Sequence, residues 1–220
     1  MDVLEYIKNY IINSEKDNDV LSKILDAERL GEEDIEPSVG VEVGRFLRLL
    51  IQLTQAKRVL EFGTCMGYST ISIAQALKYT GGKVLSVEYD EKRYLMTKKN
   101  VEEAGLGNIV ELIHGDAVKV ADGLTDQFDI ILQDADKRIY PSMLETCIRL
   151  TRTNGVIIAD DTLFKFRGWD RFTSAPLSAY NKLVFNDHRL LSTILPIGDG
   201  VTVSVKLSEG FEYGNISSCE

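Results

Sequence analysis

The chain has 220 residues, of which 44% are hydrophobic and 27% charged, as in an ordinary globular domain. Its formal net charge of −9 disfavours long-range attraction to nucleic acid or to an anionic membrane. Three widely spaced cysteines without a CxxC pair argue against a zinc ribbon or a disulfide framework, and no apolar run approaches the roughly 20 residues that span a bilayer.

The N-terminal part of the chain is predicted to be helical. Apolar residues recur every three to four positions in DVLEYIKNYII (2–12) and VGRFLRLLIQLTQ (43–55), which Pro37 separates. We therefore expect a helical extension over residues 1–56. The first residues lack the basic start and apolar run of a signal peptide, which predicts a cytoplasmic protein.

From residue 58 onward, short β-branched runs alternate with helical stretches. The expected strands are RVLEFG (58–63), KVLSVEYD (83–90), IVELIHGD (109–116), FDIILQDAD (128–136) and GVIIADD (155–161). The expected helices between them are residues 68–80, 91–105, 117–124 and 140–152. Strands that alternate with helices predict a parallel sheet covered on both faces.

The pattern changes near the end of the chain. A predicted helix over residues 178–188 is followed by the strand-like runs 190–200 and 201–207, which a Gly-Asp-Gly turn joins into an antiparallel hairpin. We expect one domain over 1–220, with an α/β core at 57–207 and a polar tail at 208–220.

Every predicted parallel strand ends in acidic residues. In chain order these are Glu61; Glu88 and Asp90; Asp116; Asp134 and Asp136; and Asp160 and Asp161. Ligands of open α/β sheets bind beyond the carboxyl ends of the strands, so we expect these carboxylates to line a ligand site.

The loop after the first strand, EFGTCMGYS (61–69), indicates the kind of cofactor. Gly63 and Gly67 allow a tight turn, but the loop is neither GxxxxGK[ST] nor GxGxxG. Glu61 would repel a pyrophosphate but suits an ammonium group, and the following helix start at Ser69 suits a carboxylate. Glu88 suits two ribose hydroxyls. The set favours a nucleoside that carries an amino acid; the alternative is a tight turn without a ligand.

Asp134, Asp160 and Asp161 form a second acidic group on strands expected to be neighbours. Like charges so close raise one another's pKa, and a hard divalent cation relieves this repulsion. Oxygen ligands point to magnesium, calcium or manganese rather than zinc. The alternative is pairing with nearby basic residues. Beside a cation and partly desolvated, Lys137 would have a lowered pKa and could accept a proton.

Four segments carry a resemblance to a known family: EFGTCMGYSTISIA, DADKRIY, GVIIADDTLF and LPIGDGVTVSVK. Across residues 39–207 the chain resembles the cation-dependent class I O-methyltransferases, the family of catechol and caffeoyl-CoA O-methyltransferases. The resemblance implies a Rossmann-like α/β fold. Its sheet would be mostly parallel, with seven strands in the order 3-2-1-4-5-7-6 and an antiparallel terminal hairpin.

The resemblance also implies a site. The residues implied to contact S-adenosylmethionine are Val39, Glu61, Gly63, Ser69, Glu88, Ala117 and Asp134. Asp134, Asp160 and Asp161 would ligate a divalent metal, usually magnesium, and Lys137 would be the general base. The family usually has Asn where this chain has Asp161, and the added charge could tighten metal binding or shift the preference towards manganese or calcium.

The implied acceptor is a small hydroxylated molecule, catechol-like or hydroxycinnamoyl-like, whose two adjacent oxygens could chelate the metal. The segment 163–176 is expected to border its pocket, where Phe166 and Trp169 either hold a flat ring or only anchor the loop. The alternative acceptor is a 5-hydroxyuridine in tRNA, contacted by Lys165, Arg167 and Arg171, although the net charge argues against it. A non-catalytic nucleoside-binding module would not need the acid group with Lys137. The resemblance also implies a homodimer.

Overall fold

The computed structural model describes residues 3–14, 19–30, 38–166, 168 and 170–210. Pro37, Arg167, Trp169 and residues 211–220 of the predicted tail lie outside the described residues. The helices are α1 (Val3–Ser14), α2 (Asp19–Leu30), α3 (Gly40–Thr54), α4 (Tyr68–Thr80), α5 (Glu91–Glu103), α6 (Ala117–Gly123), α7 (Tyr140–Leu150) and α8 (Arg171–Asn186). The strands are β1 (Arg58–Phe62), β2 (Lys83–Glu88), β3 (Val110–His114), β4 (Phe128–Gln133), β5 (Thr151–Ala159), β6 (Leu190–Leu195) and β7 (Val201–Lys206).

The seven strands form one sheet in the order β3-β2-β1-β4-β5-β7-β6, which confirms the predicted order. Strands β1 to β5 pair in parallel, whereas β7 runs antiparallel to both β5 and β6. Phe62 pairs with Gln133, and Gln133 pairs with Ala159. The ends of the three central strands are therefore level, and the residues that follow them meet at one edge.

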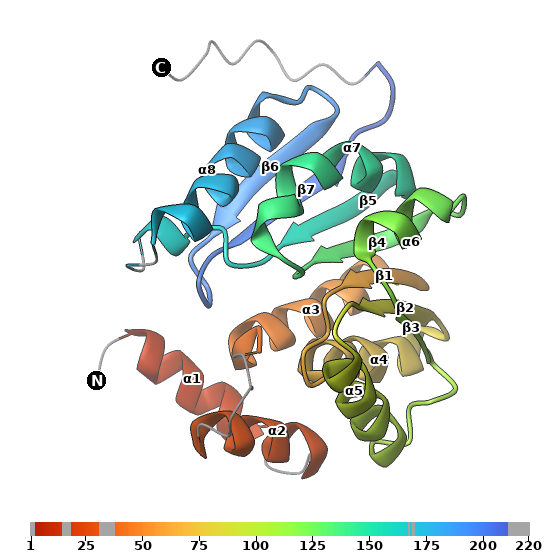
Figure 1. The fold of residues 1–220 in the computed structure, drawn as a ribbon, viewed down its shortest axis with the longest axis vertical. Helices are drawn as coiled ribbons and strands as arrows, with labels where there is room; N and C mark the ends of the chain where they lie inside the picture. Colours follow the sequence, from red (N-terminus) through yellow and green to blue (C-terminus); the bar gives the residue numbers. More distant parts are fainter. Residues whose placement is uncertain (1–2, 15–18, 31–37, 167, 169, 211–220) are drawn as a thin grey trace.

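Helices cover the sheet on both faces (Figure 1). Successive strand residues point to opposite faces. Val59 and Ile130 pack in one core with α2, α3, α4 and α5, while their neighbours Leu60 and Ile131 pack in a second core with α6, α7 and α8. Both faces of β1 and β4 are thus buried, as predicted for a parallel sheet that helices cover on both faces.

Two predicted starts are wrong, by four residues for β5 and by seven for α8. β5 begins at Thr151 and not at residue 155, because the extended chain follows directly on the end of α7 at Leu150. α8 begins at Arg171 and not at residue 178. Its first turn lacks an apolar stripe, but Asp170 caps it by accepting hydrogen bonds from the backbone N–H groups of Phe172 and Thr173.

Three of the eight acids at the strand ends cap helical turns. Asp90 accepts a hydrogen bond from the first turn of α5, Asp116 from that of α6, and Asp136 from the 3₁₀ turn Lys137–Ile139. Among the described residues, no helix is long and apolar enough to cross a membrane.

Candidate active site

The turn between β1 and α4 is pressed against the end of β4. Gly63 has a φ of 89°, and a Cβ atom there would lie 2.3 Å from the carbonyl oxygen of Asp134. Gly67 also has a φ of 89° and precedes α4. A side chain is excluded at Gly63 because the turn packs directly against the end of β4, next to the start of α4.

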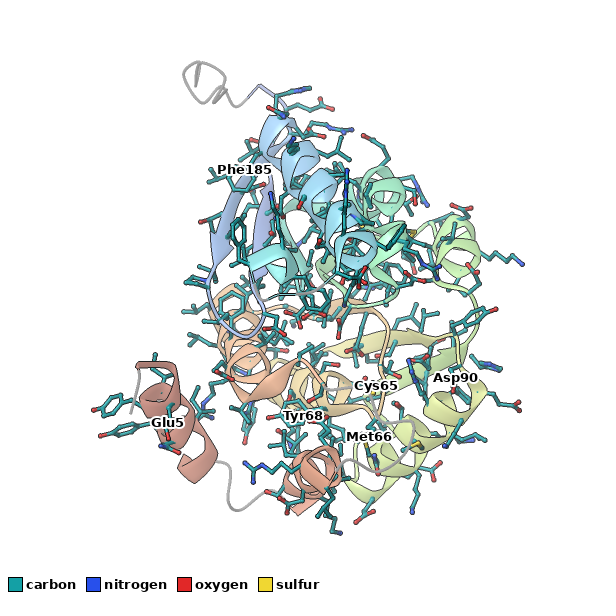
Figure 2. All side chains as sticks on the ribbon, turned by 60° about the vertical axis from the view of Figure 1, so that its left-hand side comes forward. Glu5, Cys65, Met66, Tyr68, Asp90 and Phe185 are labelled. Atoms are coloured by element: carbon teal, nitrogen blue, oxygen red, sulfur yellow. The ribbon has the colours of Figure 1, made fainter. Side chains whose placement is uncertain are left out.

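Glu88 joins this turn to β2. Its Oε2 accepts hydrogen bonds from the backbone N–H of Thr64 at 2.8 Å and of Cys65 at 3.1 Å, and its Oε1 accepts one from Asp90 at 3.0 Å. Figure 2 labels Cys65, in the turn, and Asp90, beyond β2. The Glu88 side chain is buried. The carboxylate is therefore held in one orientation at the end of β2, where the ribose site was predicted.

Glu61 lies on β1 and is completely buried. Its Oε2 accepts hydrogen bonds of 2.6 Å from the hydroxyls of Thr70 and Ser86. Burial raises the pKa of Glu61 to about 7, although hydrogen bonds from Ser69, Ser86 and Thr70 oppose this shift. Glu61 on β1 and Ser69 in the first turn of α4, both predicted cofactor residues, are thus neighbours.

The remaining predicted cofactor residues stand at helix starts. Val39 directly precedes α3 and is buried. A Cβ atom added to Gly198, in the hairpin loop, would lie 3.6 Å from the Val39 carbonyl oxygen, so this loop lies against the start of α3. Ala117 is the first residue of α6.

Asp134, Asp160 and Asp161 converge as predicted. One carboxylate oxygen from each lies within 4.8 Å of the others. Asp160 is buried, and its Oδ1 has no hydrogen-bond partner among the described residues. Burial, with the charges of Asp134 and Asp161, raises the pKa of Asp160 well above its ordinary value. Three converging carboxylates, one of which is buried and has an oxygen without a partner, fit a hard divalent cation.

Asp161 has a left-handed backbone conformation, with a φ of 64°. Asp and Asn tolerate this region better than most residues with a Cβ atom. The backbone therefore accounts for an Asp or Asn at this position, whereas the choice of Asp adds a charge to the group.

Lys137 lies among the acids. Its Nζ is 2.7 Å from Asp134 Oδ1 and 2.8 Å from Asp161 Oδ2. Burial acts to lower the pKa of Lys137, but the carboxylates of Asp134, Asp161 and Asp160 outweigh it and hold the pKa well above its ordinary value. The lowered pKa of Lys137 was predicted for a site that holds a cation beside the amine, and it stays a prediction. The alternative to a metal was pairing of the acids with basic residues, and Lys137 does pair with Asp134 and Asp161.

Tyr140 is a residue of this site that the sequence reasoning missed. Lys137 Nζ donates a hydrogen bond to the Tyr140 hydroxyl at 3.1 Å. The spacing of three residues in DADKRIY was a usable signal, because such residues share one side of a helical turn.

The residues predicted near the acceptor are described in part. Phe166 is 77% exposed. His114 is a strand residue, as expected, and its Nε2 lies 3.1 Å from the carbonyl oxygen of Tyr89.

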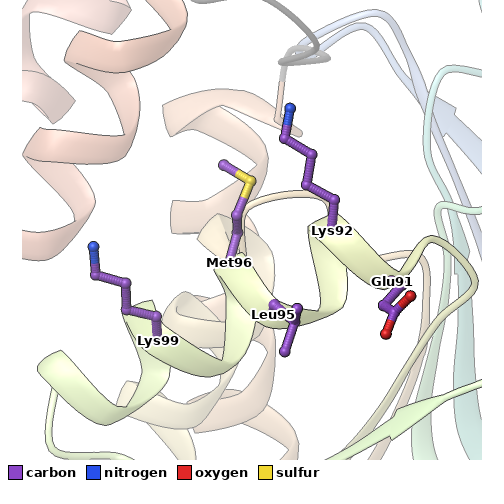
Figure 3. Close-up of a pocket in the computed structure, with 5 residues that line it drawn as sticks. All are labelled: Glu91, Lys92, Leu95, Met96 and Lys99. Carbon is purple, nitrogen blue, oxygen red and sulfur yellow. The ribbon is translucent and has the colours of Figure 1, made fainter.

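A shallow pocket of about 430 Å³ lies along α5 (Figure 3). It is lined by Glu91, Lys92, Leu95, Met96 and Lys99. None of these residues belongs to the glycine turn or to the acid group, so the pocket is separate from the candidate site.

A mostly parallel sheet of this order, with a glycine turn after β1 and acids after β4 and β5, defines a Rossmann-like methyltransferase fold. The family model described as O-methyltransferase matches residues 13–207. The chain therefore belongs to the O-methyltransferase family, whose members transfer a methyl group from S-adenosylmethionine, and the predicted family is confirmed.

Individual relatives agree with this assignment. Catechol O-methyltransferase of Niastella koreensis is 38% identical over 143 residues, which cover 63% of this chain and 64% of that protein. Caffeoyl-CoA O-methyltransferase 2 of Petunia hybrida is 30% identical over 187 residues, which cover 78% of this chain and 77% of that protein. The solved O-methyltransferase from Bacillus cereus, in complex with SAH, is 28% identical, with a TM-score of 0.75 over 86% of this chain and 91% of that one.

Proposed function

We propose that this enzyme is a divalent-metal-dependent O-methyltransferase that acts on a small acceptor with two adjacent oxygens, catechol-like or hydroxycinnamoyl-like. The observation that carries the proposal is the convergence of one carboxylate oxygen each from Asp134, Asp160 and Asp161 within 4.8 Å, beside the unpartnered Oδ1 that the buried Asp160 carboxylate holds. The names of the two relatives above support the acceptor class.

Asp134, Asp160 and Asp161 would hold the cation, magnesium first, with manganese or calcium as alternatives. A bound divalent cation orients an acceptor hydroxyl and favours its ionised form. An all-oxygen ligand set suits these ions. The extra charge of Asp161 supports tight binding, because a carboxylate attracts a cation more strongly than an amide does.

Val39, Gly63, Ser69, Glu88 and Ala117 would hold the methyl donor, together with Glu61 and Asp134. S-adenosylmethionine supplies the methyl group, and the role of these residues is to bind and orient it. The close packing of the Gly63 turn on the end of β4, which also carries Asp134, and the fixed carboxylate of Glu88 support this assignment. Much of the rate of such a transfer comes from holding the two reactants in line.

Lys137 would take the proton of the acceptor hydroxyl. Because the carboxylates around it stabilise its ammonium form, the amine can act as a base only when their charge is neutralised. Ligation of a cation by Asp134 and Asp161 would do this, since both now pair with Lys137. Cation binding by the acid group would therefore also control whether Lys137 can accept a proton.

A methyl-transfer assay tests the proposal. The purified enzyme is offered catechols, hydroxycinnamoyl thioesters and hydroxyuridine-bearing tRNA, with and without a chelator, and magnesium, manganese or calcium is then restored. We expect transfer to a small acceptor that the chelator abolishes and a cation restores. Transfer that is indifferent to the chelator would refute the metal role.

Three predictions from the sequence have no support in these relatives or in the fold. The tRNA acceptor finds no support and is not proposed. The homodimer and the cytoplasmic location stay predictions.

A further inference from the structure

We infer that Tyr140 is a positioning residue that holds the amine of Lys137 at the acid group; the inference rests on the role proposed for Lys137. The Tyr140 hydroxyl accepts a hydrogen bond from Lys137 Nζ at 3.1 Å and donates one to the Gln133 carbonyl oxygen at 2.7 Å. It thus links the lysine side chain to the last residue of β4.

The Gln133 carbonyl is a fixed point in the site. It also accepts a hydrogen bond from the backbone N–H of Asp160 at 3.1 Å. One carbonyl oxygen therefore ties together the end of β4, the residue after β5 and, through Tyr140, the lysine. A displacement of the Tyr140 hydroxyl would move Lys137 relative to Asp160.

The Tyr140 ring cannot easily move. It is buried, begins α7 and meets the Tyr180 ring edge-on, with 5.6 Å between the ring centroids. The backbone N–H of Tyr140 donates a hydrogen bond to the Lys137 carbonyl oxygen. Tyr140 therefore hydrogen-bonds both the backbone carbonyl and the side-chain amine of Lys137. The long, rotamer-rich side chain of a lysine is otherwise costly to fix in one geometry.

Tyr180 offers a matched control for the same chemical change. It is buried against the same ring, but its hydroxyl has no hydrogen-bond partner among the described residues. Tyr140→Phe and Tyr180→Phe each remove one buried hydroxyl and keep both rings. A purely structural role of the ring pair predicts similar effects, whereas a positioning role predicts an effect of Tyr140→Phe alone.

The first test measures kcat and the KM for S-adenosylmethionine for both variants, each in the native background and with Lys137→Met. Misplacement of a reacting group by about 1 Å can cost about 100-fold, so we expect Tyr140→Phe to lower kcat about 10- to 100-fold with KM nearly unchanged. Because Tyr140 acts through Lys137, it should have no further effect in the Lys137→Met background. Tyr180→Phe should leave kcat unchanged in both backgrounds.

The second test does not depend on activity. The ¹⁵N–¹H signal of the Lys137 amine, assigned by its loss in Lys137→Met, should exchange with water faster in Tyr140→Phe than in the native protein or in Tyr180→Phe. Unchanged exchange in Tyr140→Phe, or an equal loss of kcat with and without Lys137, would overturn the inference. Absence of metal-dependent transfer by the native enzyme would instead refute the proposed function, and the exchange measurement would still decide the role of Tyr140.

Discussion

At the scale of single residues, Glu61 links protonation to stability. Burial raises its pKa from 4.5 to about 7 in the folded protein, against hydrogen bonds from Ser69, Ser86 and Thr70. Between these two pH values the folded state keeps a proton that the unfolded chain has released. The free energy of unfolding therefore falls as the pH rises through this window.

Glu61→Gln isolates this contribution, because the amide oxygen can still accept from both hydroxyls but the side chain cannot ionise. From pH 4.5 to about 7, the free energy of unfolding of the native protein should fall by up to about 3 kcal/mol relative to the variant. Urea denaturation at a series of pH values measures the difference. Parallel pH profiles of the two proteins would refute the raised pKa.

At the residue scale, the sequence could predict the convergence of the acids but not the ion pairs of Lys137. Asp134 and Asp160 follow strands whose ends are level, so their convergence follows from the parallel sheet alone. The two ion pairs of Lys137 and its bond to Tyr140 depend on the conformation of the turn after β4. No spacing rule predicts the two ion pairs, whereas the three-residue spacing of Lys137 and Tyr140 is a signal for their contact. The lowered lysine pKa, which assumes a bound cation, stays a prediction.

At the scale of elements, the turn from β1 to α4 depends on the missing side chain of Gly63. Gly81, at the end of α4, also has a positive φ, of 74°, but a Cβ atom there would meet nothing within 4 Å. Gly63→Ala and Gly81→Ala therefore share the backbone strain and differ in the clash with Asp134.

Gly81→Ala should destabilise the protein by about 1 kcal/mol through backbone strain. Gly63→Ala should cost about 1–3 kcal/mol more, because the added methyl must displace the end of β4, and it should weaken S-adenosylmethionine binding as well. Thermal unfolding and calorimetric titration of the donor measure the two effects. Equal destabilisation by both substitutions would mean that the turn has room at Gly63.

Element boundaries were predictable where capping and periodicity agree. α4 begins and ends as predicted, because a glycine in the left-handed region flanks each end. α8 began seven residues earlier than expected, because RFTSAP (171–176) lacks an apolar stripe and its helical signal was the single cap at Asp170. The hairpin was predictable from its turn, but the position of β7 between β5 and β6 came from the resemblance.

At the scale of the whole molecule, the fold places the acid group and the residues proposed to bind the methyl donor at one edge of the sheet. β1 and β2 carry Gly63 and Glu88, on the side predicted for the methyl donor, and β4 and β5 carry the acid group. Asp134 belongs to both, because its carbonyl lies against Gly63 and its carboxylate faces Asp160 and Asp161. We therefore expect the cation and the methyl donor to bind at neighbouring but separable sites.

The most direct test of this separability is calorimetric titration of the native protein, Asp160→Asn and Asp136→Asn. Each protein is titrated with magnesium and, separately, with S-adenosylmethionine. Asp136 is a matched control, because it is a nearby acid that caps a 3₁₀ turn outside the acid group. We predict that Asp160→Asn weakens magnesium binding at least about tenfold and leaves donor affinity nearly unchanged, while Asp136→Asn alters neither. Unchanged magnesium binding in Asp160→Asn, or equal loss of both ligands, would contradict the account.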